Sequence, residues 1–153
     1  MLRLDPAYAE KAAAVSALTR DVSEFLDEIG LAKPSIETGQ RVTYHAACSL
    51  QHGQKVLRQP KSLLAAAGFQ VAEAAEGHLC CGSAGTYNLL QPKIATQLRD
   101  RKLGNIAATR PQIVATGNIG CITQLASKAG VPVVHTVELL DWATGGPKPA
   151  GVV

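Results

Sequence analysis

The chain has 153 residues, a formal net charge of +3, 46 % apolar residues and 4 % aromatic residues. This length suits one domain with a core of its own. Its basic residues are scattered and do not alternate with aromatic side chains, so we expect no nucleic-acid partner. No apolar run is long enough to span a bilayer, and residues 1–15 lack the apolar stretch of a signal peptide. We therefore expect a cytoplasmic protein.

The N-terminal part predicts a single helix over residues 7–29. Apolar side chains recur there at helical spacing, from Tyr8 to Ile29. Asp5 is a candidate N-cap, with Pro6 at the first helical position, and Gly30 is a candidate stop.

From residue 41 onward, strand patterns and helix patterns alternate. The predicted strands are 41–47, 69–74, 112–116 and 131–135, and the predicted helices are 54–67, 83–90, 92–108, 119–128 and 137–143. Such alternation indicates an α/β fold with an about four-stranded parallel sheet and helices on both faces, a Rossmann-like arrangement, preceded by the N-terminal helix.

This pattern divides the chain into three parts. We predict an N-terminal helical extension at residues 1–35, a domain that holds all the cysteines at 36–145, and a flexible tail at 146–153. The tail is rich in glycine and proline, which is typical of a mobile terminus.

All four cysteines fall where a predicted strand leads into a helix. Cys48 follows the first strand, Cys80 and Cys81 lie in the loop after the second, and Cys121 follows the third. Sites in parallel sheets form outside the carboxyl ends of the strands. We therefore expect the fold to bring these four side chains together at one edge of the sheet.

Clustered thiols in a reducing compartment indicate metal or redox chemistry rather than structural disulfides. Thiolate sulfur is the natural ligand of iron–sulfur clusters and also binds zinc. Helix N-termini beside the cysteines would stabilise the thiolate form. Two alternatives stay open: the cysteines are small buried apolar residues in a structural module, or Cys80 and Cys81 form a redox-active dithiol.

Four further side chains are candidates for supporting the thiols without binding metal directly: His45, His78, Gln124 and His135. His45 precedes Cys48, His78 precedes Cys80, and His135 ends the fourth predicted strand. The charged run from Arg99 to Lys102 is expected to be a solvated helix face.

The cysteine motifs resemble a known family. Cys48, the CCG at residues 80–82 and the GCITQ that begins at Gly120 are similar to the cysteine-rich CCG domain. This domain occurs in one of the subunits of heterodisulfide reductase and in the iron–sulfur subunit of glycolate oxidase. The segments YHAACSLQHGQKV, LCCGSAGTYNLLQP and ATGNIGCITQLA look most like the C-terminal part of the glycolate oxidase subunit.

The resemblance implies an electron-transfer role in a flavin-dependent glycolate oxidase, with no catalysis by this chain alone. It implies that Cys48, Cys80, Cys81 and Cys121 bind an iron–sulfur cluster, while FAD is bound by partner subunits only. The implied partners are those flavin subunits and a ferredoxin-like N-terminal half of the same subunit, with peripheral association at the inner face of a membrane through the complex.

The sequence departs from the family motif at one position. The motif ends in CXXC, whereas this chain has Gln124 three residues after Cys121. A carboxamide is a poor ligand for iron or zinc among sulfurs. A conventional Cys₄ cluster, a zinc ion and a site completed by another part of the subunit therefore all remain open.

Overall fold

The computed structural model describes residues 2–153. The elements in chain order are the 3-10 turn η1 (Leu2–Leu4), α1 (Ala9–Leu18), α2 (Val22–Ile29), β1 (Arg41–His45), the π-helical turn η2 (Ser49–Gln54), α3 (Gln59–Ala66), β2 (Gln70–Glu73), α4 (Tyr87–Leu90), α5 (Pro92–Ala108), β3 (Ile113–Thr116), α6 (Ile119–Ala126), β4 (Val133–His135) and α7 (Thr136–Ala143). The predicted α/β fold is confirmed.

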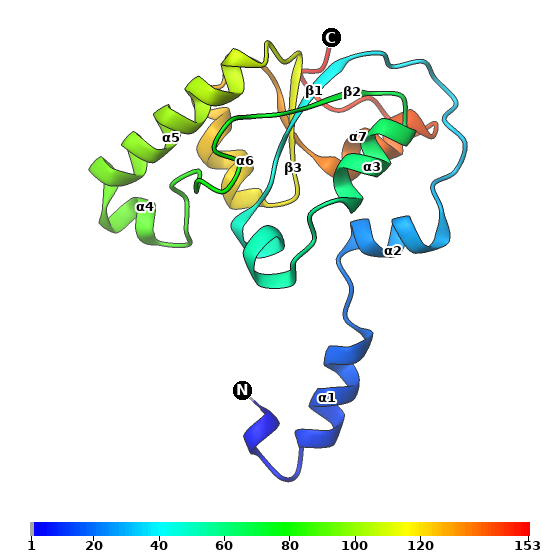
Figure 1. The fold of residues 1–153 in the computed structure, drawn as a ribbon, viewed down its shortest axis with the longest axis vertical. Coiled ribbons are helices and arrows are strands. Elements are labelled where there is room, and N and C mark those ends of the chain that lie inside the picture. Colours follow the sequence, from blue (N-terminus) through cyan, green and yellow to red (C-terminus); the bar gives the residue numbers. More distant parts are fainter. Residues whose placement is uncertain (1) are drawn as a thin grey trace.

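The four strands form one parallel sheet in the order β2-β1-β3-β4. Val42 of β1 pairs with Val71 on one side and with Ile113 on the other. Helices α5 and α6 cover one face, and α3 and α7 cover the opposite face (Figure 1). All strands therefore end at the same edge of the sheet, which is where the loops that carry the cysteines begin.

Apolar side chains on both faces of the sheet make up the core. Because both faces are covered, β3 is buried at every position instead of alternating between buried and exposed. Ile113 and Ala115 pack toward α3 and α7, whereas Val114 packs toward α5 and α6. Cys81 and Cys121 lie on the face covered by α5 and α6, in the same apolar cluster as Val114 and Leu125.

The prediction of one continuous N-terminal helix was wrong. The helix breaks after Leu18, and α2 starts anew at Asp21, whose side chain accepts from the Ser23 backbone while Glu24 reaches back to the Asp21 N–H. This capping box satisfies donors that a continuous helix would have bonded internally, so a new helix start is stabilised here.

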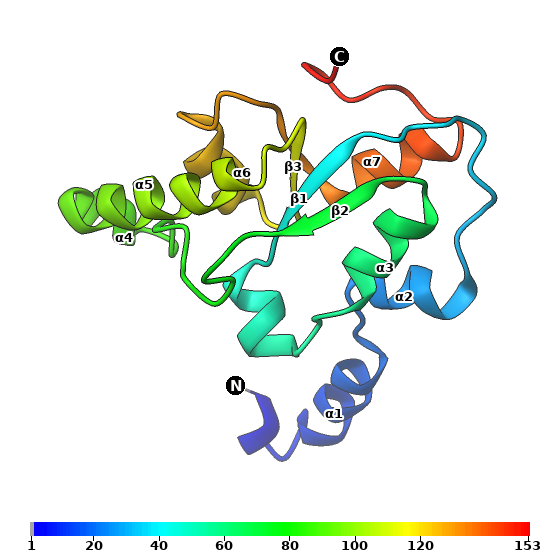
Figure 2. The same cartoon turned by 45° about the horizontal axis from the view of Figure 1, so that its top comes forward.

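The two halves of this segment have different surroundings. Helix α2 packs on α3, and its Asp27 is paired with Arg58 at 3.0 Å. Helix α1 has no buried residue, and Val15 and Leu18 are 65 % and 81 % exposed. Figures 1 and 2 both show α1 extending away from the sheet and its helices. None of the helices within residues 2–153 combines the length and apolarity needed to cross a bilayer.

Several further boundaries differ from the prediction; the helix predicted over 83–90, for example, is the short α4 (Tyr87–Leu90). The helix predicted over 54–67 starts only at residue 59: η2 ends at Gln54, residues 55–58 lie outside any helix, and Pro60 stands in the first turn of the shorter helix α3. Proline fits that position because the first helical N–H groups have no partner within the helix. In the C-terminal tail, Val152 is buried in the core beside Ala143, and Gln40 donates to the Val153 carbonyl.

Candidate metal centre

Each cysteine is held by a short turn at the carboxyl edge of the sheet. Cys48 is the N-cap of η2, just after β1. Cys80 and Cys81 lie in the loop between β2 and α4, and Cys121 is in the first turn of α6. The Asn118 side chain caps α6 by accepting from the backbone N–H groups of Gly120 and Cys121, at 2.9 and 3.2 Å. This cap fixes the direction in which the Cys121 side chain leaves the helix.

The four cysteines line a single pocket of about 430 Å³. The remaining lining residues are small or uncharged: Ser49, Ser83, Ala84, Gly85, Asn118 and Gly120. The donor set is therefore four sulfurs with no carboxylate, which is the ligand chemistry of soft, thiolate-bound metals. The predicted convergence of the cysteines is found, and their binding of a cofactor stays a prediction.

Cys81 and Cys121 form a hydrogen-bonded pair in this pocket. Their sulfurs are 3.3 Å apart, and both residues are buried. Hydrogen bonding with Cys121, opposed by burial and aided by His45, lowers the pKa of Cys81 to about 4. The same hydrogen bond and burial raise the pKa of Cys121 well above its ordinary value. The hydrogen bond between the two sulfurs therefore favours ionisation of one thiol and opposes ionisation of both.

His45 belongs to this site. A ring nitrogen of His45 and the sulfurs of Cys81 and Cys121 all lie within 4.8 Å of one another, and all three residues are buried. The Nε2 atom of His45 is buried without a hydrogen-bond partner among the described residues. A buried nitrogen of this kind usually has a partner, so the site has room for one more ligand or proton at this position.

Cys48 and Cys80 form the more accessible side of the pocket. Burial, together with the neighbouring Cys80 and Cys81, raises the pKa of Cys48 to about 11. The backbone N–H of Gly82 donates to the Cys80 sulfur at 3.3 Å. The thiols in hydrogen-bond contact at 3.3 Å are those of Cys81 and Cys121, which come from the loop after β2 and from the first turn of α6.

The other candidates from the sequence lie away from the pocket lining. His78 is exposed. His135 caps α7, because its Nδ1 accepts from the Val137 N–H and Glu138 accepts from the His135 N–H. Gln124 accepts from the Asn88 side chain at 3.4 Å, which ties α6 to α4. Of the four proposed supporting residues, only His45 reaches the cysteines.

Residues 42–126 match the family described as "CCG: Cysteine-rich domain". This chain belongs to the cysteine-rich CCG domain family. The matched range runs from β1 to the end of α6 and contains all four cysteines. Every residue that lines the cysteine pocket therefore lies within the matched range.

Curated proteins similar to this CCG domain include two iron–sulfur subunits. The chain is 41 % identical over 143 residues to the glycolate oxidase iron-sulfur subunit of Escherichia coli K12, covering 94 % of this chain. It is 31 % identical over 155 residues to the probable glycolate oxidase iron-sulfur subunit of Bacillus subtilis 168, covering 95 % of this chain. In both cases it spans about a third of the relative, 35 % of its length. Lactate utilization protein A of Bacillus licheniformis is 24 % identical over 148 residues, covering 92 % of this chain and 62 % of that protein.

The loop that carries Cys80 and Cys81 is fastened to α5 by contacts that the sequence did not reveal. Glu76 adopts the left-handed conformation, with φ of 53°. Its carboxylate accepts from Arg101 and from Asn105, the latter at 2.8 Å, and its carbonyl accepts from the Lys102 ammonium at 2.7 Å. The prediction that the run from Arg99 to Lys102 is a solvated face was wrong at Lys102, which is 1 % exposed.

The Glu76 contacts predict an acid-sensitive loop. Hydrogen bonding to Arg101 and Asn105 lowers the pKa of Glu76 from 4.5 to about 2. A lowered pKa in the folded state stabilises the fold above pH 4.5, and this stabilisation is lost as the pH falls toward 2. We expect Glu76→Gln to lower the unfolding free energy at neutral pH and to match wild type near pH 2. Urea unfolding across this range measures the difference, with the exposed Glu10→Gln as control; a pH-independent difference would contradict the assignment.

Proposed function

We propose that this CCG domain carries an iron–sulfur cluster and transfers electrons within a flavin-dependent glycolate oxidase. In this role it receives electrons from FAD on partner subunits and passes them toward a membrane acceptor. The chain itself does not oxidise the 2-hydroxy acid. The observation that carries the proposal is the single pocket formed by Cys48, Cys80, Cys81 and Cys121.

The donor set supports a thiolate-ligated cluster. When bound, such a cluster supplies a one-electron carrier whose potential depends on charge, hydrogen bonds and burial around the sulfurs. This chain supplies four sulfurs, two of them buried, and the lowered pKa of Cys81 favours the thiolate form that binds metal. Two relatives with the printed name of a glycolate oxidase iron–sulfur subunit, similar over nearly the whole chain, support the choice of complex.

The N-terminal segment supports a partner. Leu4, Tyr8, Val15 and Leu18 are more than half exposed on η1, α1 and the turn between them. Apolar side chains gathered on one protruding segment mark an interaction site more often than a free surface. We assign this segment to contact with the ferredoxin-like part of the iron–sulfur subunit, since the relatives extend well beyond the length of this chain.

One observation favours a second candidate, a single metal ion such as zinc in a structural role. His45, Cys81 and Cys121 present three ligand atoms within 4.8 Å of one another, which suits one ion. Tetrahedral zinc has Zn–S distances of about 2.3 Å, which places two ligating sulfurs roughly 3.8 Å apart. The Cys81 and Cys121 sulfurs need only a small adjustment from 3.3 Å to meet that geometry.

Anaerobic purification, followed by reconstitution with iron and sulfide, separates the two candidates. We expect a brown protein with a broad visible absorption band that bleaches on addition of dithionite, with iron and acid-labile sulfide in equal amounts. The band should also bleach when glycolate and the flavin subunits are supplied. A colourless protein with stoichiometric zinc would support the second candidate, and a colourless protein without metal would contradict both.

A further inference from the structure

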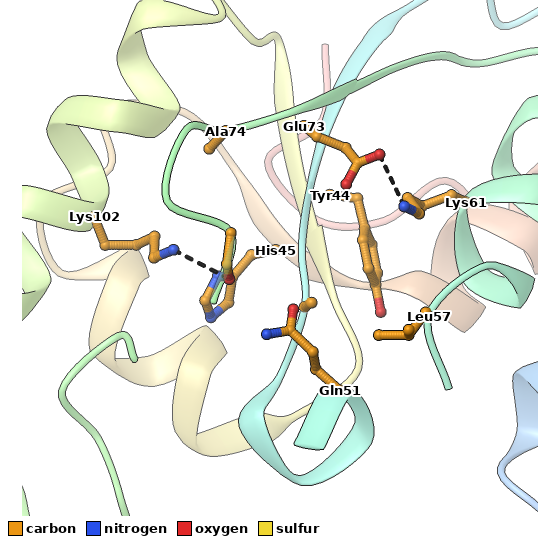
Figure 3. A pocket seen from close by; sticks show the side chains of 10 residues that line it. Tyr44, His45, Gln51, Leu57, Lys61, Glu73, Ala74 and Lys102 are labelled. Atoms are coloured by element: carbon orange, nitrogen blue, oxygen red, sulfur yellow. Dashed lines mark hydrogen bonds and ion pairs between the residues drawn. The ribbon is translucent and has the colours of Figure 1, made fainter. Parts of the chain in front are cut away.

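A second cavity lies beside the cysteine pocket and contains an unusual cation. This cavity measures about 180 Å³, and its lining includes His45, Gln51, Gly77 and Lys102. Figure 3 shows Lys102 reaching from α5 toward His45 at the end of β1. The cavity and the cysteine pocket have no lining residue in common. His45 connects them, because it lines the first and has a ring nitrogen within 4.8 Å of the Cys81 and Cys121 sulfurs.

Lys102 is buried without a carboxylate partner among its described contacts. It is 1 % exposed, and its ammonium donates to the carbonyls of Glu76 and Gly77 at 2.7 and 3.5 Å. The Glu76 carboxylate is turned to Arg101 and Asn105 instead. A buried charge without a counter-charge is costly, so such groups are normally paired or neutralised.

The negative groups around Lys102 are the cysteines and the Glu76 carboxylate. Burial lowers the pKa of Lys102, whereas the charges of Cys48, Glu76, Cys81 and Cys80 act in the opposite direction and favour the ammonium. The Lys102 carbonyl partners also belong to the loop that leads directly to Cys80 and Cys81. The ammonium is therefore fixed at one side of the thiolate site by the same loop that presents two of its sulfurs.

We propose that Lys102 is a positioning residue whose fixed buried charge offsets the negative charge of the cysteine site and raises the reduction potential of the group bound there. This inference rests on the proposed function. Reduction adds one negative charge to a thiolate-ligated cluster, so a nearby cation stabilises the reduced form more than the oxidised form. The effect is larger than for a solvated lysine because Lys102 is 1 % exposed.

The experiment is a redox titration of the reconstituted protein, monitored by the visible band and by electron paramagnetic resonance. Lys102→Met removes the charge and the hydrogen bonds, and Lys102→Gln removes the charge but keeps a donor. We expect both variants to shift the one-electron equilibrium about tenfold or more toward the oxidised form, a potential lower by about 59 mV or more. If Lys102→Met disturbs folding, Lys102→Gln and thermal melting of every variant keep the comparison interpretable.

Two control variants separate charge from structure. Asn105→Ala loosens the Glu76 loop without changing any charge, and Lys93→Met removes an exposed charge from the same helix. Both should keep the wild-type potential. Wild-type potentials in Lys102→Met and Lys102→Gln, or an equal shift in Asn105→Ala, would overturn the inference and leave the proposed function standing. Wild-type protein that forms no cluster would overturn both.

Discussion

Replacing Cys81 with serine should abolish cofactor binding. Cys81 is 1 % exposed, its pKa is lowered to about 4, and it contacts Cys121 at 3.3 Å. Serine provides a neutral, hard oxygen where the site provides a charged, polarizable sulfur. Loss of a residue that only supports a ligand weakens metal binding by about 10–100-fold, so loss of this thiolate should exceed the upper end of that range. Iron and sulfide content after anaerobic reconstitution is the measurement.

Gln124→Cys is the matched test of whether a fifth thiolate is needed. The Gln124 side chain is bonded to Asn88, and Gln124 is not part of the lining of the cysteine pocket. A cysteine there should leave iron content and the visible spectrum unchanged. Higher iron content or an altered spectrum in Gln124→Cys would show that the site uses five sulfurs. Equal iron content in wild type and Cys81→Ser would show that Cys81 is no ligand.

The location of the site was predictable because it depends on topology alone. Parallel strands that alternate with helices must end at a common edge, and the sequence places Cys48, Cys80, Cys81 and Cys121 just after three such strands. Hydrophobic patterns are sufficient for that inference, since a shift of a strand end by one or two residues leaves the edge unchanged.

The supporting residues were harder to predict because they depend on side-chain contacts across long sequence separations. Lys102 lies in a charged run, which normally indicates a solvated face, but its ammonium donates to the carbonyls of Glu76 and Gly77. His135 lies at the predicted edge of the sheet, but its side chain caps α7 and does not line the cysteine pocket. The break before α2 was predictable from the sequence, because Asp21 followed by Glu24 is a capping-box pattern.

The pocket also shows how the fold offsets the cost of clustering thiolates. Burial raises the pKa of Cys48, and the hydrogen bond with Cys81 together with burial raises the pKa of Cys121; the charges of the neighbouring sulfurs add to both shifts. Ionisation of one thiol is favoured by the hydrogen bond between Cys81 and Cys121 and by His45 beside them. A bound metal would replace the shared proton as the positive charge that allows further thiolates to ionise.

The glycine of the CCG motif should be indispensable for a steric reason. Gly82 has φ of +88°, and a Cβ at this position would lie 2.4 Å from the Ala95 carbonyl oxygen in α5. Backbone atoms of a helix cannot move aside as the end of a side chain can. Gly85, three residues later, also has a positive φ of +64°, but nothing lies within 4 Å of a Cβ there. The two positions thus differ in steric contact while sharing the conformational strain.

We therefore expect Gly82→Ala to destabilise the fold far more than Gly85→Ala. Strain from a positive φ costs of the order of 1–3 kcal/mol in either variant. Overpacking adds roughly 1–3 kcal/mol at Gly82 alone, a large part of the total stability of a domain of this size. Urea unfolding of the metal-free proteins measures both free energies. Because Gly82 directly follows Cys81, Gly82→Ala should also lose iron, while Gly85→Ala keeps it. Equal losses of stability in the two variants would show that the contact with Ala95 does not constrain the motif.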